Sequence, residues 1–196
     1  MTAIMRTLFT ITCWFSLLWI NAAQAHKPSD SYLRLYHTGT QWQGQWDIAL
    51  RDLQTVIDLD SDTDGNIRWG EVRAQHNAIA HYALTHLHLS NNHGNCTVHH
   101  QHPLIEQHAD GAYYVLQFNA DCPKSAPTLE IRYDLFFDID RQHRGLLQID
   151  YNGQTQSAVF SPEQPKLSLH LTDSNGLRQF RDYLREGVWH IAIGYD

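Results

Sequence analysis

Apolar and polar residues alternate along six segments of the chain, which is the pattern of β-strands with one buried face. The segments are 31–37, 42–50, 113–118, 129–137, 146–151 and 166–171. Turn-forming pairs such as Asp110-Gly111 and Asn152-Gly153 separate them, where an antiparallel sheet would reverse. The pattern therefore predicts a mainly antiparallel β-sandwich or partial barrel.

Two other segments repeat apolar residues at helical spacing. The first stripe is Val72, Ile79, Ala83 and Leu87, with no Gly or Pro before Gly94. The second runs over 177–191, after possible caps at 173–175. We therefore expect an α+β fold, with a mainly antiparallel β-sandwich-like domain, a helix-loop-helix inserted over 52–89, and a C-terminal amphipathic helix over 173–196.

Composition indicates a globular protein and argues against a nucleic-acid-binding one. The 196 residues are 42% hydrophobic and 18% charged, as in one globular domain. The formal net charge of −7 argues against nucleic acid as a partner, since phosphate contact requires a basic surface. The 14 histidines supply many candidate metal ligands, but their number alone does not define a site.

The first 25 residues have the features of a secretory signal peptide. Arg6 precedes the apolar stretch 8–20, and Ala23-Gln24-Ala25 matches the small-x-small cleavage pattern. The apolar stretch is shorter than the roughly 20 residues that span a bilayer, which disfavours an uncleaved anchor. We therefore expect signal peptide 1–25, a mature domain 26–172 beginning at His26, and an exported, periplasmic location.

Cleavage would also remove Cys13 and leave Cys96 and Cys122. An even pair of cysteines in an oxidising compartment predicts a disulfide. Zinc is the weaker alternative, because the pair lacks the close spacing of zinc-binding cysteines.

The strongest chemical signal is DSDTDGNIRWGE, from Asp60 to Glu71. It satisfies every fixed position of D-x-[DN]-x-[DN]-G-x5-E and resembles an EF-hand loop, which predicts Ca²⁺ as the cofactor. Carboxylates at alternate positions converge on one point, the glycine allows the sharp turn, and the final glutamate closes the shell from the next helix. The predicted ligands are Asp60, Asp62, Asp64, Asn66 through its backbone carbonyl, and Glu71.

Two features separate this loop from a signalling EF-hand. Arg68 occupies the ninth position, where a positive charge weakens cation binding. The sequence offers no second loop, so Ile67 must pack against something other than a partner loop. We expect a structural site of roughly 0.1–1 mM affinity. The alternative is an acidic exposed turn before a capped helix.

A second metal site is conceivable at the mature N-terminus. The amine and ring of His26 could chelate copper, but a further imidazole is needed, and His99, His100 and His102 are only some of the candidates. Most of the histidines are expected to be solvated surface residues.

With these features placed, the chain resembles the exported N-terminal portion of HupE/UreJ-like proteins, membrane proteins associated with nickel or cobalt uptake. Besides the acidic loop, the matching segments are AHKPSDSYL at 25–33, WDIALRDL at 46–53, DGAYYVLQF at 110–118, FFDID-RQHRGLL at 136–147, SAVFSPEQP at 157–165 and REGVWHIAIGYD at 185–196. The resemblance implies that His190 and Asp196 match the permease's metal-binding pattern. Too few residues follow Gly187 to span a bilayer, so we expect the permease part to be missing.

These observations favour a binding module over an enzyme. We expect an exported calcium-binding accessory or ectodomain module whose partners are calcium and an integral membrane metal permease or, through the C-terminal helix, the membrane surface. One alternative is a periplasmic nickel-, cobalt- or copper-handling protein that uses His26 and surface histidines. Another is an exported hydrolase with structural calcium, although no GxSxG motif is present.

Overall fold

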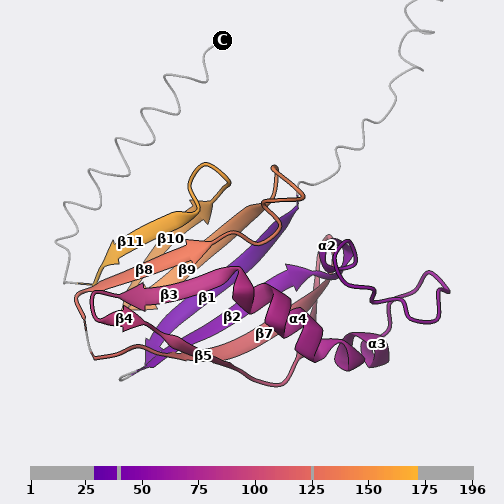
Figure 1. The fold of residues 1–196 in the computed structure, drawn as a ribbon, viewed down its shortest axis with the longest axis horizontal. Helices are drawn as coiled ribbons and strands as arrows, with labels where there is room; N and C mark the ends of the chain where they lie inside the picture. The colour runs from indigo at the N-terminus through magenta and orange to yellow at the C-terminus, as the bar shows by residue number, and fades with distance from the viewer. Residues whose placement is uncertain (1–28, 39–40, 125, 172–196) are drawn as a thin grey trace, which may run out of the picture.

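Two β-sheets stack face to face in the computed structural model, which describes residues 29–38, 41–124 and 126–171 (Figure 1). Within these residues the larger sheet has seven strands in the order β10-β9-β1-β2-β7-β5, with β6 also paired to β7. They are β1 (Asp30–Thr38), β2 (Gln41–Ala49), β5 (Thr97–His100), β6 (Leu104–His108), β7 (Gly111–Asp121), β9 (Arg144–Tyr151) and β10 (Gln154–Phe160).

The smaller sheet has four strands among the described residues, in the order β11-β8-β3-β4. They are β3 (Leu87–Asn91), β4 (Gly94–Asn95), β8 (Thr128–Tyr133) and β11 (Lys166–His170). Every strand pair in the two sheets is antiparallel within this part of the chain, except the parallel pair β1–β9. The expected α+β, mainly antiparallel sandwich-like fold is confirmed.

Each of the six segments predicted from alternation overlaps a strand, namely β1, β2, β7, β8, β9 or β11. The predicted end of the fourth segment is wrong, because β8 stops at Tyr133. Leu135 and Phe136 lie in the following turn, where they are buried, and Phe136 has a φ of 60°. The buried apolar residues of this turn therefore extend the alternating pattern past the end of the strand, and the sequence predicted a strand that was too long.

The core fills the space between the sheets. Trp46 on β2 and Tyr133 on β8 are fully buried, and their ring centroids lie 5.4 Å apart. A Cβ atom on Gly145 would lie 2.6 Å from the Tyr133 ring, so this strand position accepts only glycine without a shift of the ring. The two sheets thus interlock through large aromatic side chains.

Three helices lie among the described residues, α2 (Leu50–Leu53), α3 (Trp69–Ala74) and α4 (His76–Thr85). They gather with the segment between α2 and α3 at one end of the sandwich (Figure 1). Ile79, Ala80 and Ala83 bury one face of α4 in the core, as the spacing predicted.

The sequence predicted a single helix that runs to residue 89, and this predicted extent is wrong. Gln75, with φ −88° and ψ 4°, separates α3 from α4. The helix ends at Thr85, and Leu87 belongs to β3 instead, paired with Tyr133 and only 2% exposed. Pairing with β8 buries this side chain and satisfies its backbone, so tertiary context overrides the helical spacing.

The predicted disulfide between Cys96 and Cys122 is present, and it links the segment after β4 to the end of β7. The predicted turn between β9 and β10 is also present, with positive φ at both Asn152 and Gly153. This is the conformation of a tight hairpin turn.

The predicted signal peptide 1–25 and C-terminal helix 173–196 lie outside the described residues. None of the described helices combines the length and the apolar character needed to cross a lipid bilayer.

Candidate metal centre

The acidic loop, Asp60–Glu71, is exposed but begins and ends next to buried residues. Leu59 directly before it is fully buried, and Val72 directly after it is 1% exposed. α2 leads toward the loop and α3 leads away from it. The core therefore fixes both ends of the loop, although α2 is only a single helical turn.

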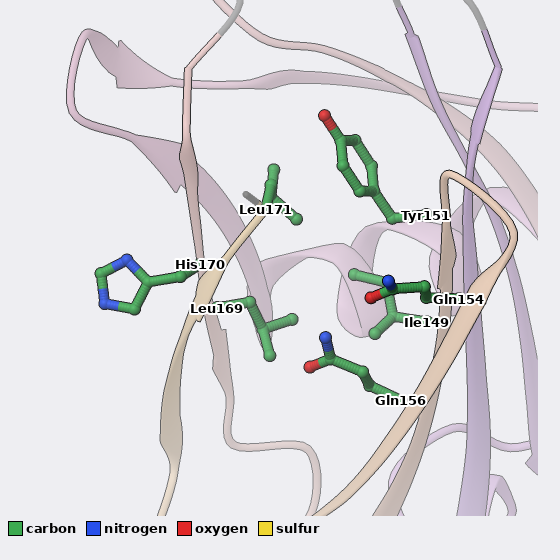
Figure 2. Close-up of a pocket in the computed structure, with 7 residues that line it drawn as sticks. All are labelled: Ile149, Tyr151, Gln154, Gln156, Leu169, His170 and Leu171. Atoms are coloured by element: carbon green, nitrogen blue, oxygen red, sulfur yellow. The ribbon is translucent and has the colours of Figure 1, made fainter. Parts of the chain in front are cut away.

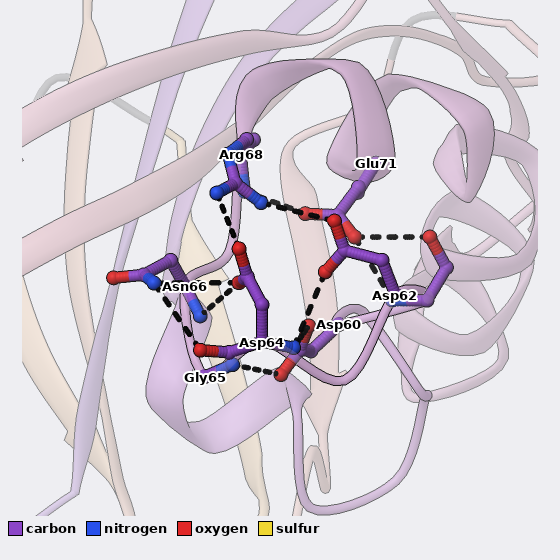
Figure 3. A network of polar contacts seen from close by, with 8 residues as sticks. Asp60, Asp62, Asp64, Gly65, Asn66, Arg68 and Glu71 are labelled. Atoms are coloured by element: carbon purple, nitrogen blue, oxygen red, sulfur yellow. Dashed lines mark hydrogen bonds and ion pairs between the residues drawn. The ribbon is translucent and has the colours of Figure 1, made fainter.

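A sharp turn at Gly65 wraps the loop around Asp60 (Figure 3). Gly65 has a φ of +84°, and its N–H donates to Asp60 Oδ2 at 2.8 Å. The N–H of Asp64 donates to the other carboxylate oxygen of Asp60 at 3.2 Å. The left-handed backbone at Gly65 is the reason this position favours glycine.

Three of the four predicted carboxylates converge. Asp60, Asp62 and Glu71 each offer one oxygen, and these oxygens lie within 4.8 Å of one another. Calcium binds oxygen at about 2.3–2.6 Å, so two ligands on one ion lie at most about 5 Å apart. The three oxygens therefore fit around a single calcium ion.

Glu71 is held in place by hydrogen bonds from both sides of the loop. Its Oε2 accepts the N–H of Arg68 at 2.9 Å, and its Oε1 accepts the N–H and the hydroxyl of Ser61, each at 2.9 Å. The Arg68 N–H and the Ser61 donors lower the pKa of Glu71. The carboxylate at the closing position of the loop is therefore ionised at neutral pH and fixed at the start of α3.

Arg68 pairs with two of the loop carboxylates. Its guanidinium lies 3.2 Å from Asp62 Oδ2 and makes a close ion pair with Asp64 Oδ2. The side-chain hydrogen bond from Arg68 is the main cause that lowers the pKa of Asp64. Asp64 therefore turns toward Arg68 instead of joining the other three carboxylates, and a bound cation would compete with this guanidinium.

Asn66 and Ile67 contact groups other than the three converging carboxylates. The Asn66 amide donates to the carbonyl and to Oδ1 of Asp64, both at 3.3 Å. Ile67 is partly buried and packs against the core of its own domain. The apolar position that joins paired EF-hand loops is thus accommodated without a second loop.

The second predicted metal set, His26, His190 and Asp196, lies outside the described residues. Among the described histidines, the ring of His100 lies 5.0 Å from that of His76, whose Nδ1 is 2.7 Å from the hydroxyl of Tyr114. Burial lowers the pKa of His76, and the neighbouring imidazoles add to this effect.

Only two groups of three described His, Cys, Asp or Glu residues bring ligand atoms within 4.8 Å of one another. One belongs to the acidic loop, and the other is Asp47, Glu106 and His108. The second group was not predicted. Asp47 lies at one of the polar positions of the alternating segment 42–50. Nothing in the local sequence therefore distinguishes it from a solvated residue.

Figure 2 shows a crevice between the β9–β10 hairpin and β11. It is lined by Ile149, Tyr151, Gln154, Gln156, Leu169, His170 and Leu171, and its volume is about 10 Å³. A space of this size holds about one water molecule. The crevice is therefore too small for an organic ligand.

A larger cavity of about 420 Å³ is lined by residues of both sheets, including His37, Trp42, Asp121, Thr128 and Tyr151. Its lining includes no residue of the acidic loop. The hydrolase alternative requires a concave site with convergent polar groups away from that loop, and this cavity is where its substrate would bind. That alternative stays a prediction.

Comparison with known protein families found no family that matches this chain, and comparison with curated proteins found no similar protein.

Proposed function

We propose that this protein is a calcium-binding module in which one Ca²⁺ ion occupies the acidic loop. The observation that carries the proposal is the convergence of Asp60, Asp62 and Glu71, whose oxygens lie within 4.8 Å of one another. These are hard oxygen ligands on a single exposed loop, and calcium accepts irregular coordination geometry, whereas magnesium requires a nearly ideal octahedron.

The ion would act on structure rather than on a substrate. Asp60 follows the buried Leu59, and Glu71 lies at the start of α3 beside the buried Val72. One cation bound to both carboxylates therefore ties the two ends of the loop together and offsets the repulsion among its acidic side chains. The Arg68 guanidinium already offsets part of this repulsion, which favours an affinity of roughly 0.1–1 mM.

The wider role rests on sequence features outside the site. The signal-like residues 1–25 support export, and the resemblance to HupE/UreJ-like proteins supports an accessory or ectodomain role in the uptake of nickel or cobalt. We propose this setting as the one in which the calcium module works. Calcium at millimolar concentration outside the cytoplasm would occupy at least about half of the sites at this affinity.

The test is thermal unfolding of the purified, processed chain in chelator and in millimolar calcium. Calcium at about 1 mM is expected to raise the Tm by roughly 1–6 °C, given an affinity of roughly 0.1–1 mM. Glu71→Gln is expected to weaken calcium binding by at least about tenfold in a calorimetric titration. Asp58→Asn, which removes the same charge just before the loop, is the matched control and is expected to bind calcium like the wild type.

An identical Tm in chelator and in calcium, together with no bound calcium by native mass spectrometry, would contradict the proposal. Equal weakening in Asp58→Asn and Glu71→Gln would also contradict it, because the loop would then attract cations only through its net charge.

A further inference from the structure

Asp47 is fully buried, although it lies on the outer face of the larger sheet. Its neighbours on β2, Trp46 and Ile48, belong to the core between the sheets, so Asp47 points to the opposite side. The strand register places it beside Tyr32 on β1 and Val115 on β7. A carboxylate with no solvent exposure on this face must be covered by other side chains.

Two side chains fix the carboxylate in position. Arg34 Nη2 donates to Asp47 Oδ2 at 2.8 Å, and Gln45 Nε2 donates to Oδ1 at 2.8 Å. Each carboxylate oxygen has a second lone pair, so these two bonds leave acceptor capacity on Asp47. The carboxylate is therefore oriented and remains able to bind a further donor or a cation.

His108 covers Asp47 from β6. Its ring stacks on Tyr113 at a centroid distance of 4.1 Å, and its Nε2 lies 3.6 Å from Asp47 Oδ2. That nitrogen is buried and has no hydrogen-bond partner among the described residues. A buried ring nitrogen that faces a carboxylate without a hydrogen bond is an unfavourable arrangement, and a cation held between the two groups would remove the penalty.

Glu106 supplies a third ligand to the same point. One atom each from Asp47, Glu106 and His108 lies within 4.8 Å of the other two. Glu106 is exposed on β6, whereas Asp47 is buried. The group, which we call the outer-face cluster, therefore combines a buried, fixed carboxylate with one that is accessible from solvent.

We infer that the outer-face cluster is a binding site for a divalent first-row transition metal ion such as zinc, nickel or cobalt. One imidazole nitrogen and two carboxylate oxygens suit zinc, nickel or cobalt, whereas calcium prefers oxygen ligands alone. The metal takes the lone pair of His108 Nε2, and water completes its coordination. Arg34 opposes the cation electrostatically and limits the affinity.

A proton is the competing occupant. A hydrogen on Nε2 would face the Asp47 carboxylate with no metal between the two groups. The two occupants differ in a measurable way, because zinc at neutral pH changes the ring of His108 only if it binds there.

The test is a calorimetric titration of the full chain with zinc while calcium saturates the acidic loop. Glu106→Gln and His108→Gln are each expected to weaken the tightest zinc-binding event by at least about tenfold. The matched controls are His99→Gln on β5 and Glu130→Gln on β8, both exposed, and they are expected to leave that event unchanged. Glu106 is exposed, so its variant is expected to retain the fold, which circular dichroism checks.

Wild-type zinc affinity in His108→Gln overturns the inference. So does equal weakening in the His99→Gln control, which would show diffuse binding by surface histidines. A His108 ring NMR signal that does not respond to zinc at neutral pH overturns it in favour of the proton. Calcium binding by Glu106→Gln is measured in parallel, and its retention separates this inference from the proposed calcium function.

Discussion

The hydroxyl of Tyr133 lies 2.6 Å from Nε2 of His143, and both side chains are fully buried. On the other side of the imidazole, Nδ1 lies 2.5 Å from the hydroxyl of Ser29, which donates to Asp52 Oδ2 at 2.8 Å. Because the Ser29 proton is used on Asp52, Nδ1 carries the ring proton and Nε2 accepts from Tyr133. His143 is therefore held as a neutral imidazole with one defined tautomer.

The chain of hydrogen bonds continues into the core. The hydroxyls of Ser31 and Tyr133 lie 2.7 Å apart, and Trp46 Nε1 donates to Ser31 at 3.0 Å. Since Tyr133 donates to His143, Ser31 donates to Tyr133. Every donor thus points toward Asp52 in α2, and the network joins the centre of both sheets to the helix that precedes the acidic loop.

The burial of His143 predicts an acid-sensitive stability. Burial lowers the pKa of His143 to about 4, below the ordinary value of 6.5. The unfolded chain therefore binds a proton more readily, so this stabilisation is complete above pH 6.5 and is lost as the pH falls toward 4. We expect the free energy of unfolding to drop by about 2 kcal/mol between pH 7 and pH 5 from this group.

Urea unfolding at both pH values checks this expectation. His143→Gln is expected to be less stable at pH 7 and to show a smaller loss on acidification, whereas exposed His170→Gln keeps the wild-type pH dependence. Asp52, whose pKa is raised by burial, acts in the opposite direction in all three proteins. The same pH dependence in His143→Gln and the wild type would refute the assignment.

Replacing Gly65 with alanine is expected to weaken calcium binding by roughly fivefold, because alanine resists the positive φ that the ordered loop requires. Gly70→Ala is the matched control. A Cβ atom there meets nothing within 4 Å, and Gly70 lies in α3, where alanine favours the helix. Calorimetric calcium titration compares the two. Equal affinities would show that the left-handed turn is not part of the bound loop.

Removal of the Arg68 charge is expected to tighten calcium binding by roughly three- to tenfold, because the guanidinium competes for Asp62 and Asp64. In chelator the same Arg68→Gln variant is expected to unfold at a lower temperature than the wild type, since the loop loses its internal cation. Arg73→Gln, which removes an exposed charge in α3, is the control. Unchanged calcium affinity in Arg68→Gln would exclude this competition.

Loss of the Cys96–Cys122 disulfide is expected to lower the free energy of unfolding by about 3 kcal/mol, since the bond closes a loop with a sequence separation of 26. Denaturant unfolding of the variant with both cysteines replaced by serine measures the loss. Reductant should destabilise the wild type by a similar amount and leave the variant unchanged. A wild type indifferent to reductant would count against a stabilising role.

Alternation in the sequence identified strands with one apolar face, but it could not identify strands without one. The inward positions of β10 are Gln154, Gln156, Ala158 and Phe160, of which only Phe160 is a large apolar residue, and four of the five residues of β6 are exposed. The parallel pairing of β1 with β9 also has no local signature, because it depends on contacts between distant segments.

The two proposed metal sites also differ in how far the local sequence predicts them. The acidic loop is a local motif, so its spacing predicted which carboxylates lie near one another, apart from the turn of Asp64 toward Arg68. Asp47 and His108 are brought together only by the paired strands of the larger sheet and by the side chain of His108 folding back over Tyr113. Neither effect can be inferred from residue spacing.

The central place of β1 has a consequence for how the chain assembles. β1 pairs along its length with β2, which follows it directly, and with β9, which begins only at Arg144. During synthesis one edge of the β1–β2 hairpin has no native neighbour until most of the polypeptide has emerged, and such an edge can recruit foreign strands. This long-range closure gives a high contact order, so folding on the slow, millisecond-to-second timescale of β-sandwiches is expected, with a need for protection from aggregation until the late strand arrives.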